Sequence, residues 1–298
     1  MTDLRAATRG SPLALWQTRH VAGLLSRTVD EVVVSTVGDR KTDVPIHTMG
    51  GKGVFVKEVQ AAVLDGRADF AVHSGKDLPA ETPDGLVLVA VPARADARDA
   101  LVGSAWLDLP TGARVATGSV RRRAQLAWHR SDLVFSELRG NIQTRLGKLD
   151  SGGFDAIVMA AAAIDRLELS LEVTVDRLDP AVMVPQVAQG ALAIECRSDD
   201  AETITTLAGI EDADTRRVVD AERAFLSELG GDCDLPAGAH AVTTADGEVE
   251  MEGMLSSLDG RVLIRERRVG DDPDMLGRSI ARHLLDDAGG SALLAGPR

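Results

Sequence analysis

The chain has 298 residues, of which 44% are hydrophobic and 27% charged; this suffices for two or three packed domains and argues against a disordered chain. Its formal net charge of −13 disfavours nucleic acid as a partner, because an acidic protein repels phosphates. No apolar run approaches the roughly 18 residues of a membrane-spanning helix. The sequence after Met1 contains no apolar signal segment, so we expect a cytoplasmic protein that does not enter a membrane.

Cysteines and histidines give no sign of a metal site. Two cysteines, Cys196 and Cys233, cannot form a disulfide framework or a zinc site of cysteines alone. The six histidines are scattered and form no metal-binding pair. The apolar neighbours Leu192 and Ile194 indicate that Cys196 is a buried structural thiol, whereas Cys233 is expected in an exposed loop.

Positive charge is concentrated in one part of this acidic chain. Between residues 114 and 148, eight Lys and Arg side chains accompany two carboxylates, which gives this segment a charge of +6. Such a cluster is costly unless an anion neutralises it. A small polyanion fits better than DNA, because the acidic remainder of the protein would repel a long phosphate backbone.

The first strand and helix are predicted at 4–8 and 12–26. Ser11 precedes the helix and Pro12 occupies its first position, the pattern of an N-cap followed by proline. Arg9 and Ser11 are therefore expected between a strand end and a helix N-terminus, whose free N–H groups favour anions. The cap alone would also explain Ser11.

A second strand is predicted at 31–37, followed by a polar loop. The glycine-rich segment 49–58 then enters a helix that ends near Gly66. Its spacing matches neither a P-loop nor a dinucleotide-binding loop, so nucleotide binding is not expected. We interpret the segment as a flexible cover over a neighbouring cleft; a plain helix-entry loop is the alternative.

The segment 70–79 carries the chemistry of the predicted first lobe. Phe70 to Val72 is typical of a buried strand, and Pro79 ends the regular structure. The polar residues between them are His73, Ser74, Lys76 and Asp77. In open α/β sheets, ligands bind at the carboxyl ends of strands, so a functional site is expected here. A solvated turn would explain this segment if it stood alone.

A further strand is predicted at 86–91, and the polar stretch 92–99 is interpreted as a linker to a second lobe. Strands are predicted there at 114–117, 133–138 and 156–159. The first two end in basic residues that begin helices, as Arg9 does in the first lobe, which predicts anion-binding groups at these strand ends. The residues are Ser119, Arg121, Arg122 and Arg123 after the first strand, and Arg139, Gly140, Asn141 and Arg145 after the second. A solvated helix face is the alternative for the three successive arginines, of which at most two can face one cleft.

The C-terminal part is predicted as a separate α+β unit. A strand at 192–196 is expected to return to the first lobe, so that two crossovers close a cleft between the lobes. A helix at 212–229 precedes the loop that contains Cys233. Strands at 239–244, 248–256 and 262–268 then form a short antiparallel sheet, and a helix begins at Pro273.

Motifs distributed over nearly the whole chain resemble the porphobilinogen deaminase (hydroxymethylbilane synthase) family. They are RAATRGSPLA at 5–14, GGKGVF at 50–55, HSGKDLP at 73–79, LRGN at 138–141, QGA at 189–191 and the late Cys233. The resemblance implies two α/β lobes like those of type II periplasmic binding proteins and a smaller C-terminal α+β domain. The implied domains are 1–93 with 189–208, 97–185 and 213–298.

The resemblance also implies a transferase of heme biosynthesis. In that reaction, four porphobilinogen units are joined head to tail on a dipyrromethane cofactor, ammonia leaves each time, and hydroxymethylbilane is released by hydrolysis. The cofactor would be attached to Cys233 by a thioether. The implied protein is a cytoplasmic monomer that acts on a small molecule.

The family's site residues fall on matching positions of this chain. Asp77 is the implied catalytic residue. The implied cofactor-binding residues are Cys233, Lys76, Asp77, Ser119, Arg121, Arg122, Arg139, Gly140 and Gln189. The implied substrate-binding residues are Arg9, Ser11, Lys52, Phe55, Arg139, Arg145 and Arg166.

Two other functions remain compatible with parts of this pattern. A non-catalytic, two-lobed anion-binding protein would share the lobes and the basic cleft but would not need Cys233. Nucleic-acid binding through Arg121 to Arg123 is the weakest alternative, given the net charge.

Overall fold

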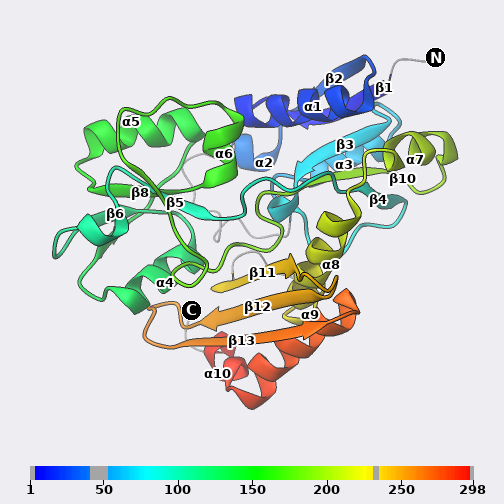
Figure 1. Ribbon diagram of the computed structural model, residues 1–298. Helices are drawn as coiled ribbons and strands as arrows, with labels where there is room; N and C mark the ends of the chain where they lie inside the picture. Colours follow the sequence, from blue (N-terminus) through cyan, green and yellow to red (C-terminus); the bar gives the residue numbers. More distant parts are fainter. Residues whose placement is uncertain (1–3, 41–52, 231–234, 296–298) are drawn as a thin grey trace.

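The computed structural model describes residues 4–40, 53–230 and 235–295, which contain two five-stranded sheets and one three-stranded sheet (Figure 1). The first sheet has the order β2-β1-β3-β10-β4 and the second the order β7-β6-β8-β5-β9. The strands of the first sheet are β1 (Leu4–Arg9), β2 (Val29–Val34), β3 (Phe70–Ser74), β4 (Leu86–Ala90) and β10 (Leu192–Arg197). Those of the second are β5 (Asp99–Val102), β6 (Arg114–Ala116), β7 (Val134–Ser136), β8 (Ala156–Ala160) and β9 (Val175–Arg177).

Both sheets are built in the same way. The first three strands in each order are parallel, and the fourth, β10 or β5, runs antiparallel to both of its neighbours. In sequence order, this fourth strand is the first strand after the chain crosses from the other lobe. The shared order 2-1-3-n-4 is that of type II periplasmic-binding-protein lobes, so the predicted fold class is confirmed.

Helices cover the two sheets and leave the strand ends facing the space between the lobes (Figure 1). The first lobe contains α1 (Pro12–Leu25), α2 (Val37–Arg40), α3 (Lys57–Leu64) and α7 (Ala201–Ala208); the second contains α4 (Val120–His129), α5 (Ile142–Gly152) and α6 (Ala161–Arg166). Apolar residues of β1, β3 and β10, including Phe70 and Ile194, form the centre of the first lobe. Cys196 is fully buried there, as predicted.

The third unit packs helices against an antiparallel sheet. Strands β11 (Ala237–Thr243), β12 (Val249–Ser256) and β13 (Leu263–Gly270) lie in that order, beside α8 (Ala213–Glu228), α9 (Pro273–Arg282) and α10 (Gly290–Ala295). Phe225 and Ile280 are fully buried between the helices and the sheet. This arrangement confirms the predicted C-terminal α+β unit.

Several sequence-based expectations about elements were wrong. The second strand begins and ends earlier than 31–37, and residues after it form the short helix α2 rather than a loop. Strands β5 and β9 and helix α7 were not predicted. The polar stretch 92–99 ends in a buried strand residue, because Asp99 begins β5 and has no exposed surface.

Glu222 on α8 connects the third unit to both crossovers between the lobes. Its carboxylate is fully buried and accepts hydrogen bonds from both Nη atoms of Arg94, at 2.8 and 3.0 Å. It also accepts from the backbone N–H of Ala188, at 2.6 Å, and of Ala241 in β11, at 2.9 Å. One side chain thus fixes the two hinge segments to the third sheet.

We expect Glu222→Ala to lower the free energy of unfolding by about 3–5 kcal/mol, since it leaves the largely buried Arg94 without its counter-charge and two backbone N–H groups without an acceptor. Urea unfolding measures this loss. Glu228→Ala is the control on the same helix: Glu228 pairs with Arg278 and Arg282 near the surface, and its loss should cost far less. Equal losses for the two variants would contradict the role of Glu222.

Candidate active site

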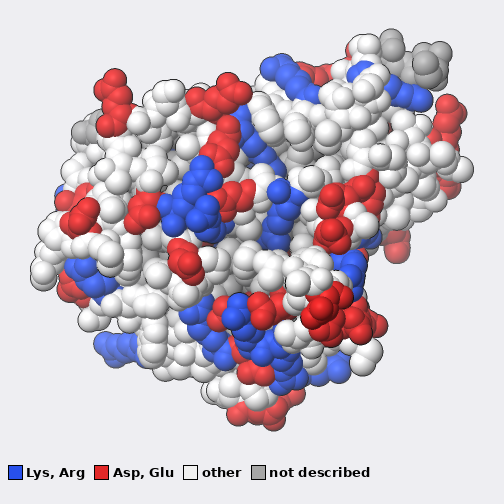
Figure 2. All heavy atoms as spheres, viewed as in Figure 1, with Lys and Arg blue, Asp and Glu red and all other residues white. Residues whose placement is uncertain are grey.

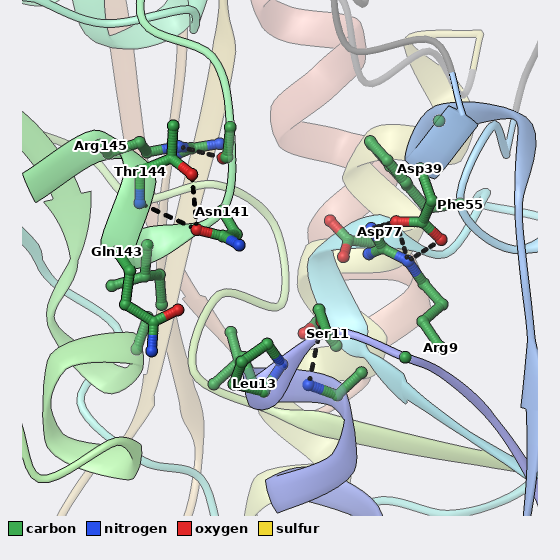
Figure 3. A pocket seen from close by; sticks show the side chains of 18 of the residues that line it. Arg9, Ser11, Leu13, Asp39, Phe55, Asp77, Asn141, Gln143, Thr144 and Arg145 are labelled. Carbon is green, nitrogen blue, oxygen red and sulfur yellow. Dashed lines mark hydrogen bonds and ion pairs between the residues drawn. The ribbon is translucent and has the colours of Figure 1, made fainter. Parts of the chain in front are cut away.

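A cleft of about 930 Å³ lies between the two lobes and is lined by residues of both. The first lobe contributes Arg9, Ser11, Asp39, Phe55 and Asp77, which face Asn141, Gln143, Thr144 and Arg145 of the second lobe (Figure 3). Lys and Arg side chains are exposed where the two lobes meet (Figure 2). The carboxyl ends of β1 and β3 and the N-termini of α1 and α5 all open into this cleft, as the strand-end pattern predicted.

Asp77 lines the cleft from a single 3-10 turn that follows β3. The backbone N–H of Gly75 in that turn donates to the carbonyl of Ala191, at 2.9 Å. A Cβ atom on Gly75 would lie 3.0 Å from the Cβ of Ala188, so only glycine lets the turn pack this closely against the crossover. The crossover between the lobes therefore fixes the position of Asp77.

Lys76 lies beside Asp77 and also lines the cleft. Its Nζ donates to Oε1 of Gln189, at 3.2 Å. Burial and the nearby charge of Arg122 lower the pKa of Lys76 to about 8, although Asp77 and Asp99 oppose the shift. The amine is thus easier to deprotonate than an ordinary lysine, and an additional anion in the cleft would favour its charged form.

Arg139 and Arg145 line the opposite wall, at the start of α5. Nε of Arg145 donates to the carbonyl of Gly140, at 2.8 Å. Burial, together with the charges of Arg122 and Arg139, lowers the pKa of Arg145 to about 10, while Asp77 acts in the opposite direction. Burial also lowers the pKa of Arg139. Burial therefore opposes the charged form of both guanidiniums, and an anion in the cleft would favour that form.

Arg9 is held at the rim by an ion pair and an aromatic ring. Its Nε lies 3.2 and 3.1 Å from the two carboxylate oxygens of Asp39, and its guanidinium lies 4.2 Å from the centre of the Phe55 ring. Burial opposes ionisation of Asp39, but hydrogen bonds from Arg9 and Thr36 lower its pKa. A Cβ on Gly38 would lie 2.1 Å from the ring of Phe55, so glycine is needed for this stacking.

Three helix caps lie in or beside the cleft. The Oγ of Ser11 accepts from the N–H of Ala14, at 3.3 Å, and the Oγ of Ser119 accepts from the N–H of Arg122, at 3.4 Å. Ser11 lines the cleft, whereas Ser119 is not among the lining residues. Oδ1 of Asn141 caps α5 from the cleft wall.

The three successive arginines separate as their helical spacing requires. Arg121 and Arg122 are buried, and Arg123 is exposed and lies over the ring of Phe135. Only Arg122 lines the cleft. Arg121 and Gln189 lie behind its wall, so any direct contact of theirs with a ligand would require movement.

Arg166 also lies outside the cleft lining. Its Nη2 donates to the carbonyl of Gly190, at 2.7 Å, and its guanidinium lies 5.8 Å from the centre of the Trp16 ring. Burial lowers its pKa to about 10. In this arrangement Arg166 connects α6 of the second lobe to α1 of the first.

Two of the predicted site residues, Lys52 and Cys233, lie outside the described residues. The structure also brings residues to the cleft that sequence reasoning did not select. They are Gln17, Asp39, Gln143, Thr144 and Lys148. Gln17 of α1 donates to the Oγ of Ser74 in β3, at 2.8 Å. No local sequence pattern predicts this contact, because the two elements are far apart in the chain.

Positive charge is in excess in the cleft. Among the described lining residues, six cations accompany two carboxylates. The cations are Arg9, Lys76, Arg122, Arg139, Arg145 and Lys148; the carboxylates are Asp39 and Asp77. The pKa values of Lys76 and Arg145, both depressed by burial, agree with this excess. A dipyrromethane, whose two pyrroles each bear an acetate and a propionate, fits this donor set.

Fold and site thus define a two-lobed α/β protein with a polyanion-binding cleft around one carboxylate, completed by a third α+β unit. Residues 4–205 match the porphobilinogen deaminase dipyrromethane cofactor binding domain, and residues 217–286 match the C-terminal domain of the same enzyme. The chain belongs to the porphobilinogen deaminase family. This confirms the predicted family and its cofactor and favours the enzyme over the non-catalytic binding protein.

Curated relatives match nearly end to end. The porphobilinogen deaminase of Brevibacillus brevis is 44% identical over 98% of this chain and 97% of its own, and that of Acidithiobacillus ferrooxidans 46% over 95% and 94%. A periplasmic binding protein of Salmonella typhimurium matches 72% of this chain and 94% of its own, at 11% identity and a TM-score of 0.41, which is too distant to inform the site.

The described part of the chain offers neither a candidate membrane span nor a candidate metal site. Within residues 4–40, 53–230 and 235–295, no helix is long and apolar enough to cross a membrane. The same residues contain no group of three or more His, Cys, Asp or Glu side chains that could hold a metal ion.

We expect competitive acetylation of the folded protein across a pH series to give Lys76 a midpoint near 8. The reason is the burial of its amine beside Arg122. In the urea-unfolded chain the same lysine should titrate near the ordinary value of about 10.4. Peptide mass spectrometry measures both midpoints, and equal values in the two states would show that the amine is not buried.

Proposed function

We propose that this protein has hydroxymethylbilane synthase activity, with porphobilinogen as substrate. Four porphobilinogen units would be joined head to tail, with loss of ammonia at each step and release of the product by hydrolysis. The observation that supports this best is the excess of cations around Asp77 in the cleft of a chain of this family. We further propose that the protein works as a cytoplasmic monomer; its net charge of −13 disfavours a nucleic-acid partner.

The cations suit a substrate with several carboxylates. Every added pyrrole brings an acetate and a propionate, so the growing chain accumulates negative charge. Arg139 and Arg145 can form paired hydrogen bonds with carboxylates on the wall of the second lobe, where Arg122 adds positive charge. Lys76 supplies positive charge from the first lobe. Arg9 can receive a carboxylate at the rim by exchanging it for Asp39.

Asp77 is proposed as the catalytic residue. When ammonia leaves porphobilinogen, the C–N electron pair departs with nitrogen, and positive charge develops on the methylene carbon and its pyrrole ring. A fixed carboxylate at this point stabilises that charge electrostatically and can accept hydrogen bonds from pyrrole N–H groups. Lys76 and Arg145 lie near this carboxylate, and the charge of Asp77 favours their protonated forms.

The dipyrromethane, attached through a thioether to Cys233 in this proposal, supplies the terminal pyrrole carbon to which the first substrate unit is joined. This chain's residues would bind its carboxylates from both walls: Lys76 from the first lobe, and Arg122, Arg139 and Arg145 from the second. Cys233 would act as a tether and would not turn over.

We expect Asp77→Asn to fold and to retain the covalent cofactor but to lose turnover by a factor of about 10² to 10⁴, because the developing positive charge loses its counter-charge. Product formation and intact mass measure the two properties. Asp65→Asn, which removes an exposed carboxylate paired with Arg67, is the control and should be fully active. Normal turnover by Asp77→Asn would exclude the assignment.

We expect Cys233→Ser to lack the mass of the cofactor that the wild-type chain carries. Cys196→Ala is the matched control and should keep that mass, because Cys196 is buried and burial raises the pKa of its thiol to about 11, which leaves little reactive thiolate. An intact-mass spectrum compares the three proteins. An adduct that persists in Cys233→Ser and disappears in Cys196→Ala would reverse the assignment.

A further inference from the structure

Asp99 is a fully buried carboxylate where the second lobe begins, behind the wall of the cleft. Its Oδ1 lies 2.9 Å from Nε and 2.7 Å from Nη2 of Arg122. The same oxygen accepts from Nε2 of Gln189, at 3.0 Å, and Oδ2 forms an ion pair with Nη2 of Arg121, at 2.8 Å. One carboxylate thus fixes three buried side chains.

Two paths lead from Asp99 to the cleft. Arg122 lines the cleft and is held directly, with its third nitrogen donating to the carbonyl of Val158, at 2.9 Å. Gln189 forms the second path: its Nε2 donates to Asp99, and its Oε1 accepts from Nζ of Lys76, at 3.2 Å. Nε2 of Gln189 also donates to the carbonyl of Ala97, at 2.8 Å, so Asp99 and Ala97 together orient the amide. This orientation decides whether Lys76 finds an acceptor.

Charge in this cluster does not balance. Arg121, Arg122 and Lys76 bring three positive charges against the one charge of Asp99. Burial alone would raise the pKa of Asp99, but Arg121 and Arg122 hold it near 2, so the carboxylate is ionised at neutral pH. Asp77, beside Lys76, offsets a second charge, so one positive charge remains in excess. Arg122 and Lys76 line the cleft and can present it to a ligand.

We propose that Asp99 is a positioning residue of the reaction: it fixes Arg122 directly, and Lys76 through Gln189, in the arrangement in which they bind substrate and cofactor carboxylates. Asp99 also holds Arg121 behind the cleft wall, because the two side chains form an ion pair. Asp99 touches neither ligand. This inference rests on the proposed function of the cleft.

Asp96 provides a matched control three residues earlier in the same segment. Its carboxylate also pairs with two arginines, Arg98 and Arg177, each at 2.7 Å. Neither of these arginines lines the cleft. Asp96→Asn therefore tests the loss of a doubly paired carboxylate at the hinge. Asp99→Asn adds the connection to the cleft and the full burial of the pair.

The first readout is the titration of Lys76, which needs neither cofactor nor turnover. The charged groups that act on its amine are Arg122 and Arg145, which lower its pKa, and Asp77 and Asp99, which raise it. Removing the charge of Asp99 should move the acetylation midpoint of Lys76 below that of the wild-type protein. Asp96→Asn should leave this midpoint unchanged.

The second and third readouts concern the ligands. For Asp99→Asn we expect a smaller fraction of cofactor-loaded chains by intact mass. In the chains that are loaded, we expect a KM for porphobilinogen raised about tenfold or more, as for the loss of one charge-assisted contact, with a smaller change in kcat. Asp99→Glu, which retains the charge, should recover part of the loading.

A midpoint, loading and KM equal to those of Asp96→Asn would overturn the inference. If Asp99→Asn does not fold, Asp99→Asn with Arg121→Gln removes one negative and one positive charge together, and the lowered midpoint of Lys76 must persist in it. Failure of the proposed function would look different: the wild-type protein itself would carry no adduct and form no product.

Discussion

The site depends on positive charge held in a partly buried cleft with too few carboxylates to neutralise it. Buried cations are costly unless an opposite charge is near. Asp99 neutralises part of this positive charge from behind the cleft wall, and Asp39 neutralises another part at the rim. The positive charge that these two carboxylates do not neutralise faces the cleft, around Asp77. In the proposed function, a ligand rich in carboxylates completes this charge balance, and the same few side chains serve binding and catalysis.

The fold makes this concentration of charge possible. Two lobes with the same strand order direct strand ends and helix N-termini at each other, so cations from residues far apart in sequence share one space. Glu222 fixes the two crossovers by accepting hydrogen bonds from Arg94 and from the backbone N–H of Ala188. The turn that presents Asp77 packs against the second of them. Any relative movement of the lobes would therefore act on the acid and on the cations together.

Local sequence patterns predict several features of the fold and of the cleft. The Ser11 cap and the strand ending before Asp77 follow from helix-capping rules and apolar periodicity. Helical repeat predicts that at most two of the three successive arginines face the cleft, but it does not identify Arg122. The role of Asp99 could not be predicted, because a carboxylate in a polar stretch normally indicates surface. Its burial results from β5 pairing with β8, a contact between strands nearly 60 residues apart that leaves no local signal. Ligand binding by the predicted residues also depends on the three-dimensional arrangement of the loaded protein, which local sequence patterns do not encode.

The most direct test is a crystal structure of the cofactor-loaded protein at a resolution that shows side chains. Continuous density should run from the sulfur of Cys233 into the cleft, with pyrrole nitrogens beside Asp77. The carboxylates should lie on Lys76, Arg122, Arg139 and Arg145. A Cys233 sulfur on another face of the molecule, or pyrrole carboxylates turned away from these cations, would contradict the account.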